Sequence, residues 1–272
     1  MLFNFELKPP LECAGLESPE TRNEYVGWFY LTYSEYYIKL GDVNLFESSP
    51  QWIEKYKPEY PSIGRFEDYQ YSRQLEDLFE ILPTIACPMP EDLYELVETA
   101  EKCESLFNSI INIYSDSDDK QEDEKFENIR INLIYYGYLD SSYLRFKTNL
   151  KFFNVNGKII VQYDFIDDDE GCPVWSAGKG TYSLTYKEFV YEIEDLLNRF
   201  FIAMDKQVET ATRIFNKDVI KKRNLIPEYA QRKDYFYDIL NKVKNNDYEN
   251  QIDWQKLRED LDYFMKQILS TP

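Results

Sequence analysis

The chain of 272 residues contains no histidine, and this absence excludes several kinds of catalytic and metal site. Ser-His-Asp triads, Cys-His dyads and imidazole-bound zinc sites all need an imidazole ring. An enzyme with this sequence would have to use carboxylates, tyrosines, lysines or a metal ion brought by the substrate. We therefore expect a binding protein with no catalytic residues, no cofactor and no resident metal.

Glycine is also scarce, with 9 residues in the whole chain. A phosphate-binding loop needs several backbone amides aimed at one phosphate, and its motif is Gly-x-x-x-x-Gly-Lys-Ser/Thr. The stretch Gly178-Lys179-Gly180 lacks this spacing. It predicts a turn before a strand rather than a nucleotide site.

Long hydrophobic runs are missing too, because Glu, Asp or Lys interrupts every apolar stretch. No window reaches the length needed to span a bilayer, and the N-terminus has no apolar signal segment. The cysteines are far apart and form no Cys-x-x-Cys pair; they are Cys13, Cys87, Cys103 and Cys172. We expect a protein of the reducing cytoplasm that is not inserted in a membrane.

Negative charge, in contrast, is abundant and unevenly distributed. The formal net charge is −19, from 31 basic and 50 acidic residues. Residues 1–127 hold 10 Lys or Arg against 28 Asp or Glu, whereas residues 211–245 hold 9 against 4. Such a field repels nucleic acid and anionic membranes and speeds encounter with a cationic protein. The need for solubility alone, without any basic partner, explains the acidic composition about equally well.

Hydrophobic periodicity predicts an α+β fold in one domain over residues 1–272. We expect an antiparallel sheet built from N-terminal and central strands, packed by a long helix and several further helices. The expected segments are N-terminal strands in 1–47, a helical middle in 66–136, central strands in 142–184 and C-terminal helices in 186–270.

In the N-terminal half, alternation of apolar and polar residues predicts a strand over 2–8, and short aromatic-rich runs predict strands over 25–32, 35–40 and 43–46. A proline-rich loop should follow and carry Trp52 into the core. Helical spacing predicts a helix over 68–82 that Pro83 ends, and one continuous helix over 90–114. The acidic run 115–124 should be a mobile loop, with helical spacing returning at Phe126.

In the C-terminal half, strands over 149–153 and 158–165 should form a hairpin, because Asn156-Gly157 supplies the left-handed residues of a tight turn. Another strand is expected over 181–184. The pair Thr185 and Glu188 forms a capping box that should open a long helix. Two more helices should begin near Pro227 and after Asp253.

Three groups of side chains are candidates for contact with a basic partner: an acidic loop, a tyrosine cluster and an acidic turn. Carboxylates attract cations, and tyrosines offer a rigid surface with a polar tip. Ordinary solvated turns and half-buried packing tyrosines remain the alternative reading. The candidates are Asp116, Asp118, Asp119, Glu122, Asp123, Glu124, Tyr135, Tyr136, Tyr138, Asp167, Asp168, Asp169 and Glu170.

A hard cation is the rival occupant of the acidic turn, since calcium and magnesium prefer several oxygen ligands. Its ligands would be Asp164, Asp167, Asp168 and Asp169. These residues do not follow the alternating spacing of a calcium loop. A solvated turn is therefore the preferred interpretation.

Several blocks of the sequence resemble an uncharacterised bacterial family known only as a domain of unknown function. The blocks are Phe3-x-Phe5-x-Leu7-x-Pro9, Trp28-x-x-Leu31-Thr32 and Pro173-Val174-Trp175-x-Ala177. The family has a glycine after the Leu-Thr pair, where this chain has Tyr33-Ser34, so that turn departs from the pattern. The resemblance implies no activity and no catalytic residues, and its setting is similar to that of immunity proteins for polymorphic toxins.

These observations favour an acidic cytoplasmic inhibitor that neutralises a basic toxin domain, for example a nuclease, by occluding its active site. Carboxylates would then take the place of nucleic-acid phosphates. Two alternatives stay open. One is a carboxylate- and metal-dependent enzyme, and the other is a regulatory adaptor with no toxin partner.

Overall fold

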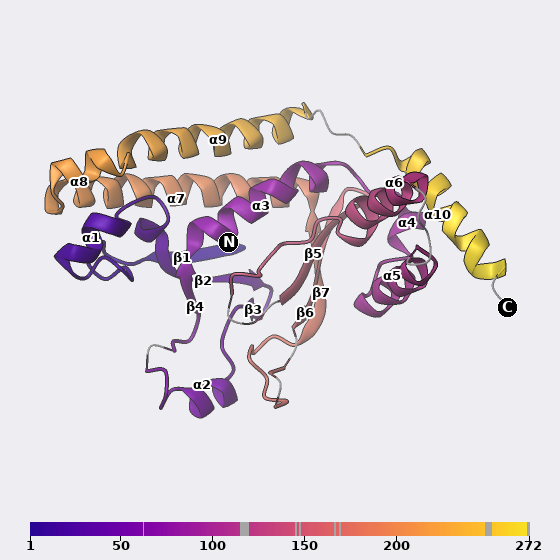
Figure 1. Ribbon diagram of the computed structural model, residues 1–272, viewed down its shortest axis with the longest axis horizontal. Helices are drawn as coiled ribbons and strands as arrows, with labels where there is room; N and C mark the ends of the chain where they lie inside the picture. Colours follow the sequence, from indigo (N-terminus) through magenta and orange to yellow (C-terminus); the bar gives the residue numbers. More distant parts are fainter. Residues whose placement is uncertain are drawn as a thin grey trace.

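Figure 1 shows a computed structural model of the chain, which has the expected α+β architecture. It describes residues 1–61, 63–114, 120–144, 146, 148–165, 167–168, 170–247 and 252–270. In this part of the chain the strands form two antiparallel sheets, each covered by helices. The expected α+β class is confirmed. The N-terminal and central strands, which were expected in one sheet, form separate sheets.

The N-terminal sheet is organised around one strand that pairs with the other three. Its strands are β1 (Phe3–Leu7), β2 (Tyr33–Leu40), β3 (Val43–Leu45) and β4 (Glu67–Gln70). Strand β2 pairs antiparallel with β1, β3 and β4. Alternate residues of β2 are buried, from Ser34 to Leu40, so one face of this sheet points into the core.

The second sheet is a three-stranded meander of β5 (Thr148–Val155), β6 (Lys158–Phe165) and β7 (Lys179–Thr185). The expected hairpin joins β5 to β6. Asn156 and Gly157 have φ values of 51° and 74°, as the primed two-residue turn requires. The strand expected over 181–184 is present, but it begins at Lys179, so Lys179 and Gly180 belong to β7 and not to a turn before it.

Three long helices cover one side of the sheets in the described part of the chain. They are α3 (Tyr71–Ala86), α7 (Tyr186–Ile214) and α9 (Leu225–Asn245), and the short helix α8 (Lys217–Lys222) lies between α7 and α9 in the sequence. The capping box of Thr185 and Glu188 opens α7, as predicted. Helices α7 and α9 lie side by side, with α3 next to them (Figure 1). Among the helices that the structure describes, none has the length and hydrophobicity to cross a bilayer.

A group of shorter helices, here called the helical lobe, packs against the other face of β5. It consists of α4 (Glu91–Tyr94), α5 (Ala100–Tyr114), α6 (Lys120–Ile129), the π-helical turn η2 (Arg130–Ile134) and α10 (Trp254–Ser270). The lobe has its own hydrophobic cluster, which includes Phe153 and Val155 of β5. Leu150 and Phe152 of the same strand belong to the larger cluster under α3 and α7.

Two segments near the N-terminus differ from the prediction. Residues 25–32 are not a strand but the end of α1 (Pro19–Tyr25) and a 3-10 turn, η1 (Tyr30–Thr32). The expected loop around Trp52 is the helix α2 (Pro50–Tyr56). Ser49 caps this helix and Pro50 occupies its first position, so the proline begins a helix here instead of excluding one. Trp52 is buried, as predicted.

Two predicted helices have different bounds. Pro83 does not end α3, which continues to Ala86 and buries Ile85 completely. The continuous helix over 90–114 is wrong, because α4 and α5 are separate. Between them Val97 is fully buried, and the carbonyl of Glu98 accepts a hydrogen bond of 2.7 Å from the Gln162 side chain. These long-range contacts outweigh the local helical spacing.

Replacing Gly137 by alanine should destabilise the fold severely. Gly137 has a φ of 58°, and an added Cβ would lie 2.0 Å from the carbonyl oxygen of Phe152. We expect the free energy of unfolding to fall by about 2–4 kcal/mol, from left-handed strain and the backbone clash. Urea unfolding measures this change. Gly178→Ala is the control, because an added Cβ there meets nothing within 4 Å; an equal loss in both variants would contradict the argument.

Candidate functional site

The acidic run predicted as a loop is helical from Lys120 onward. Glu122, Asp123 and Glu124 lie in the first turns of α6, where negative side chains suit the positive end of the helix dipole. Asp123 accepts a hydrogen bond of 2.8 Å from the Tyr114 hydroxyl, and Glu122 accepts one from Tyr263 of α10. The remaining candidates of this run, Asp116, Asp118 and Asp119, lie outside the described residues.

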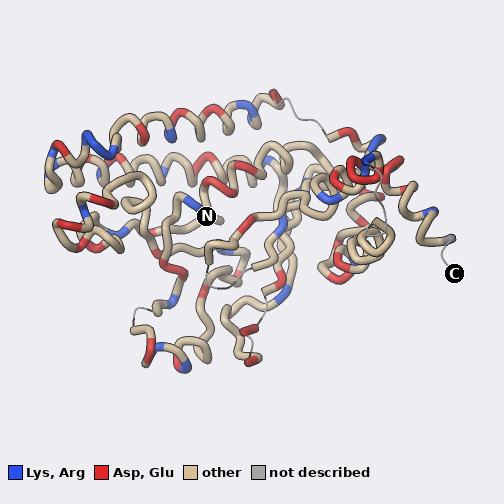
Figure 2. Tube along the Cα trace, viewed as in Figure 1, with Lys and Arg blue, Asp and Glu red and all other residues tan. Residues whose placement is uncertain are grey.

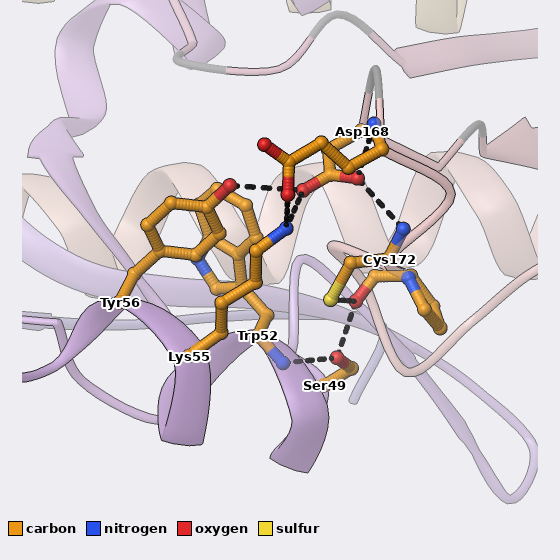
Figure 3. Close-up of polar contacts among 8 residues, drawn as sticks. Ser49, Trp52, Lys55, Tyr56, Asp168 and Cys172 are labelled. Carbon is orange, nitrogen blue, oxygen red and sulfur yellow. Dashed lines mark hydrogen bonds and ion pairs between the residues drawn. The ribbon is translucent and has the colours of Figure 1, made fainter.

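The predicted acidic turn is held by internal contacts of Asp168 (Figure 3). One carboxylate oxygen accepts hydrogen bonds from the backbone amides of Glu170 (3.0 Å) and Cys172 (2.7 Å). The other accepts from Lys55 Nζ and the Tyr56 hydroxyl, each at 3.0 Å. These contacts lower the pKa of Asp168 to about 2, with the Cys172 amide as the largest cause.

Helix α2 is therefore tied to the turn at both of its ends. Near its beginning, Ser49 accepts a hydrogen bond of 3.0 Å from the Trp52 amide and donates one to the Pro173 carbonyl (Figure 3). The Asp168 side chain is 5% exposed and its carboxylate is engaged within the chain, which leaves it little surface for a partner. Glu170 is 73% exposed and pairs with Lys55. Asp167 is exposed, and Asp169 lies outside the described residues.

The tyrosine cluster divides between core and surface. Tyr136 is fully buried, stacks on Phe153 and donates a hydrogen bond of 2.8 Å to the Cys87 carbonyl. Tyr136 is therefore not among the exposed tyrosines that could contact a partner, because the helical lobe covers this ring. Tyr135 is 42% exposed, and Tyr138 is partly exposed.

Tyr135 and Tyr138 line a groove of about 580 Å³, here called the tyrosine groove. Helix α5 forms one wall, the end of η2 and the two tyrosines form another, and β5 with Asp164 of β6 forms the floor. The lining residues are Ala100, Cys103, Glu104, Phe107, Ile134, Tyr135, Tyr138, Thr148, Asn149, Lys151 and Asp164. The groove brings together two of the predicted tyrosines and one aspartate of the predicted metal set.

A buried lysine lies at the floor of the tyrosine groove. Lys151 is 6% exposed, and its Nζ donates a hydrogen bond of 2.7 Å to the Ile134 carbonyl and lies 3.1 Å from Cys103 Sγ. Among the described residues no carboxylate forms an ion pair with it. Carbonyls at the last turn of a helix lack intrahelical partners and carry partial negative charge, so the end of η2 stabilises the ammonium.

The rim of the groove carries carboxylates. Lys179 forms ion pairs with Glu101 and, at 3.6 Å, with Asp164, and Lys179 lowers the pKa of Glu101 to about 2. Glu104 is exposed and has no ion pair with any residue that the structure describes. The rim therefore carries more carboxylates than cations, and Phe107, Tyr135 and Tyr138 give the walls aromatic surface. A cationic side chain suits the rim, away from the Lys151 ammonium at the floor.

Sequence reasoning missed Lys151, Cys103, Glu104 and Phe107. One signal was present in the sequence, since Lys151 stands between the apolar Leu150 and Phe152 in a predicted strand. A lysine on the inward face of a strand needs a partner, which marks a site. Its neighbour Cys103 is distant in sequence, so no local pattern could pair the two.

The metal alternative finds no support in the described part of the chain. There, no three His, Cys, Asp or Glu side chains are grouped so that they could hold a metal ion. Asp164 pairs with Lys179, and Asp168 is held by Lys55 and Tyr56. The other proposed ligands are Asp167, which is exposed, and Asp169, which lies outside the described residues.

A second titratable cluster lies at Asp77 of α3. The pKa of Asp77 is raised to about 7, chiefly by desolvation and also by the charges of Asp140, Glu80 and Glu76, while a hydrogen bond with Tyr143 opposes the shift. One carboxylate oxygen of Asp77 is buried without a partner. The folded state therefore disfavours the ionised form of Asp77.

Asp168 and the four groups that donate hydrogen bonds to it are here called the Asp168 clamp. This clamp should stabilise the protein only while the Asp168 carboxylate is ionised. Because the folded-state pKa is depressed below 3.8, this stabilisation is present above about pH 4 and is lost as the pH falls to about 2. We expect Asp168→Ala to lower the melting temperature at neutral pH and to have much less effect near pH 2. Asp167→Ala is the matched control. Equal effects of Asp168→Ala at the two pH values would contradict this role.

Asp77→Asn should stabilise the protein at alkaline pH. A folded-state pKa raised from 3.8 to about 7 means that wild-type stability falls as the pH rises from about 4 to about 7. The asparagine variant escapes this loss, and we expect a gain of about 1–2 kcal/mol near pH 8, after solvent screening. Urea unfolding at about pH 5 and pH 8 tests the difference, with Asp42→Asn in an exposed turn as control. A gain that does not depend on pH would argue against this origin.

Comparison with known proteins places the chain in a family. A search of curated proteins and a search of solved structures each gave no match. The match to a family covers residues 2–260, which is nearly the whole chain and includes the groove, the clamp and both sheets. The chain therefore belongs to DUF5984, a family of unknown function.

Proposed function

We propose that this protein is an immunity-type inhibitor, which binds a basic toxin domain through the helical lobe and the tyrosine groove and covers the toxin's active site. The observation that carries the proposal is a concentration of negative charge beside an open aromatic groove. Residues 91–127 hold 13 acidic and 3 basic residues, a net charge of −10 out of −19 for the chain. Figure 2 shows acidic positions gathered over α5 and α6.

Part of this charge is available for a partner. Some carboxylates of the lobe have internal contacts, such as Asp92 with Arg258 at 2.8 Å. Others are exposed and have no ion pair among the described residues; they are Glu91, Glu95, Glu104 and Glu124. Unpaired exposed carboxylates contribute little to stability, and they are free to contact cations of another protein.

Most of the basic side chains at the other end of the molecule are occupied internally. Arg232 of α9 pairs with Glu76 at 2.6 Å, and Lys233 pairs with Asp205 at 3.1 Å. Lys221 and Lys222 of α8 are exposed. The exposed carboxylates of the lobe that have no ion pair among the described residues therefore form an acidic surface, and a basic domain is its complement.

The proposed mechanism separates steering from anchoring. The charge of the lobe attracts the basic domain from a distance and accelerates encounter. An arginine or lysine of that domain then enters the tyrosine groove, where Glu104 supplies charge and Tyr135 supplies an aromatic face. A nuclease or similar toxin binds phosphates with its basic residues, so carboxylates at those positions would exclude the substrate.

Co-expression tests the proposal directly. If the gene beside this chain's gene encodes a large secreted protein with a basic C-terminal domain, that domain is the partner to use. We expect the chain to restore growth of cells that express the domain and to co-purify with it. Co-purification without restored growth would indicate an adaptor instead. If neither occurs, the inhibitor reading fails.

Neutralising the free carboxylates of the lobe should slow association. We expect Glu91, Glu95 and Glu104, changed together to glutamine, to reduce the association rate about tenfold at low salt and to flatten its salt dependence. The matched control changes Glu12, Glu24 and Glu54 to glutamine, which alters net charge equally at exposed positions elsewhere. Stopped-flow binding measures both rates. The same slowing in the control would show that net charge, and not this surface, matters.

A further inference from the structure

We propose that Cys103 and Lys151 form a site of peroxide-driven modification, in which a covalent nitrogen–sulfur bond joins α5 to β5. The two side chains come from elements that are 48 residues apart and meet at the floor of the tyrosine groove. Their reactive atoms, Lys151 Nζ and Cys103 Sγ, are 3.1 Å apart. This separation lies within the range in which bond formation between held groups is efficient, about 3–3.5 Å.

The surroundings hold the pair in place. The Ile134 carbonyl accepts a hydrogen bond of 2.7 Å from Lys151 Nζ and is also 3.8 Å from Cys103 Sγ. Both side chains are at most 6% exposed, yet both line the groove, so a small oxidant reaches them from solvent. Reactive cysteines lie in electropositive and partly accessible surroundings, and the lysine provides that environment.

The other three cysteines lack this arrangement. Among the described residues none of them has a hydrogen bond with a lysine or arginine side chain. Burial raises the pKa of Cys13 to about 12, which keeps that thiol protonated. Cys172 is partly exposed, and its sulfur lies 3.9 Å from the Pro173 carbonyl oxygen. Cys103 is thus the cysteine placed to react with an amine.

The reaction has two balanced steps. In the first, the sulfur of Cys103 attacks one oxygen of hydrogen peroxide, the O–O bond breaks, and sulfenic acid and water form. In the second, the Lys151 nitrogen, having released a proton to water, attacks the sulfenic sulfur. The S–O bond breaks, an N–S bond forms and a second water leaves. Sulfur is oxidised by two electrons, and peroxide is reduced by the same two.

The product is a sulfenamide that a thiol can reduce to the starting side chains. It would fix the α5 wall of the tyrosine groove to the β5 floor. It would also convert the Lys151 ammonium to an uncharged nitrogen, which removes the buried charge held by the end of η2. Oxidation would therefore change the shape and the charge of the groove together.

Mass spectrometry of the full chain tests the proposal with hydrogen peroxide as the probe. After reduction and removal of the reductant, we expect peroxide to lower the intact mass by about 2 Da, the mass of two hydrogen atoms. Dithiothreitol should restore the original mass. Peptide mapping without reductant should find the Cys103 and Lys151 peptides joined, and the linkage should disappear when peroxide is added to the protein unfolded in urea.

Three variants separate this bond from other oxidation. Lys151→Arg keeps the positive charge but should give no linked peptide, and Cys103→Ser should give none either. Cys172→Ser is the matched control and should link as the wild type does. Sulfenic or sulfinic acid at Cys103 without a linkage, or a mass loss that maps to a disulfide, would overturn the proposal. The wild-type peptide map decides the matter even if a variant fails to fold.

Discussion

Strand β5 is covered on both faces, and the two hydrophobic clusters of the chain meet across it. Leu150 and Phe152 point toward the cluster under α3 and α7, whereas Phe153 and Val155 point toward the helical lobe. Each such side chain contributes about 1.5–3 kcal/mol when it is fully buried. The position of the lobe relative to the long helices therefore depends on this strand and on its register with β6.

The same constraint explains why a lysine is buried at the groove. The two-residue period of a strand places Lys151 on the face of Phe153 and Val155, which the lobe covers. Its ammonium must therefore find partners inside the protein. The end of η2 supplies a carbonyl and α5 supplies the Cys103 sulfur, so the tyrosine groove is a consequence of how the lobe closes over β5.

Local signals in the sequence predicted those elements whose determinants are close together in the chain. The Asn156-Gly157 turn and the Thr185 capping box are examples, because each needs only a few adjacent residues. Predictions failed where distant contacts decide the conformation. The run 25–32 is aromatic-rich like a strand, yet it contains helical turns, and Trp28 packs on Phe200 and Phe236 of α7 and α9.

The sequence by itself limited the chemistry that this protein can perform, because it has no imidazole, few glycines and an excess of carboxylates before residue 128. It also determined the α+β class, through periodicities that extend over single elements. Only the tertiary structure decided which of those carboxylates stay free. Asp168 is occupied by Lys55, which is 113 residues away, whereas Glu104 stays exposed at a groove. Charge is a property of each residue, but its availability depends on neighbours that only folding brings into contact.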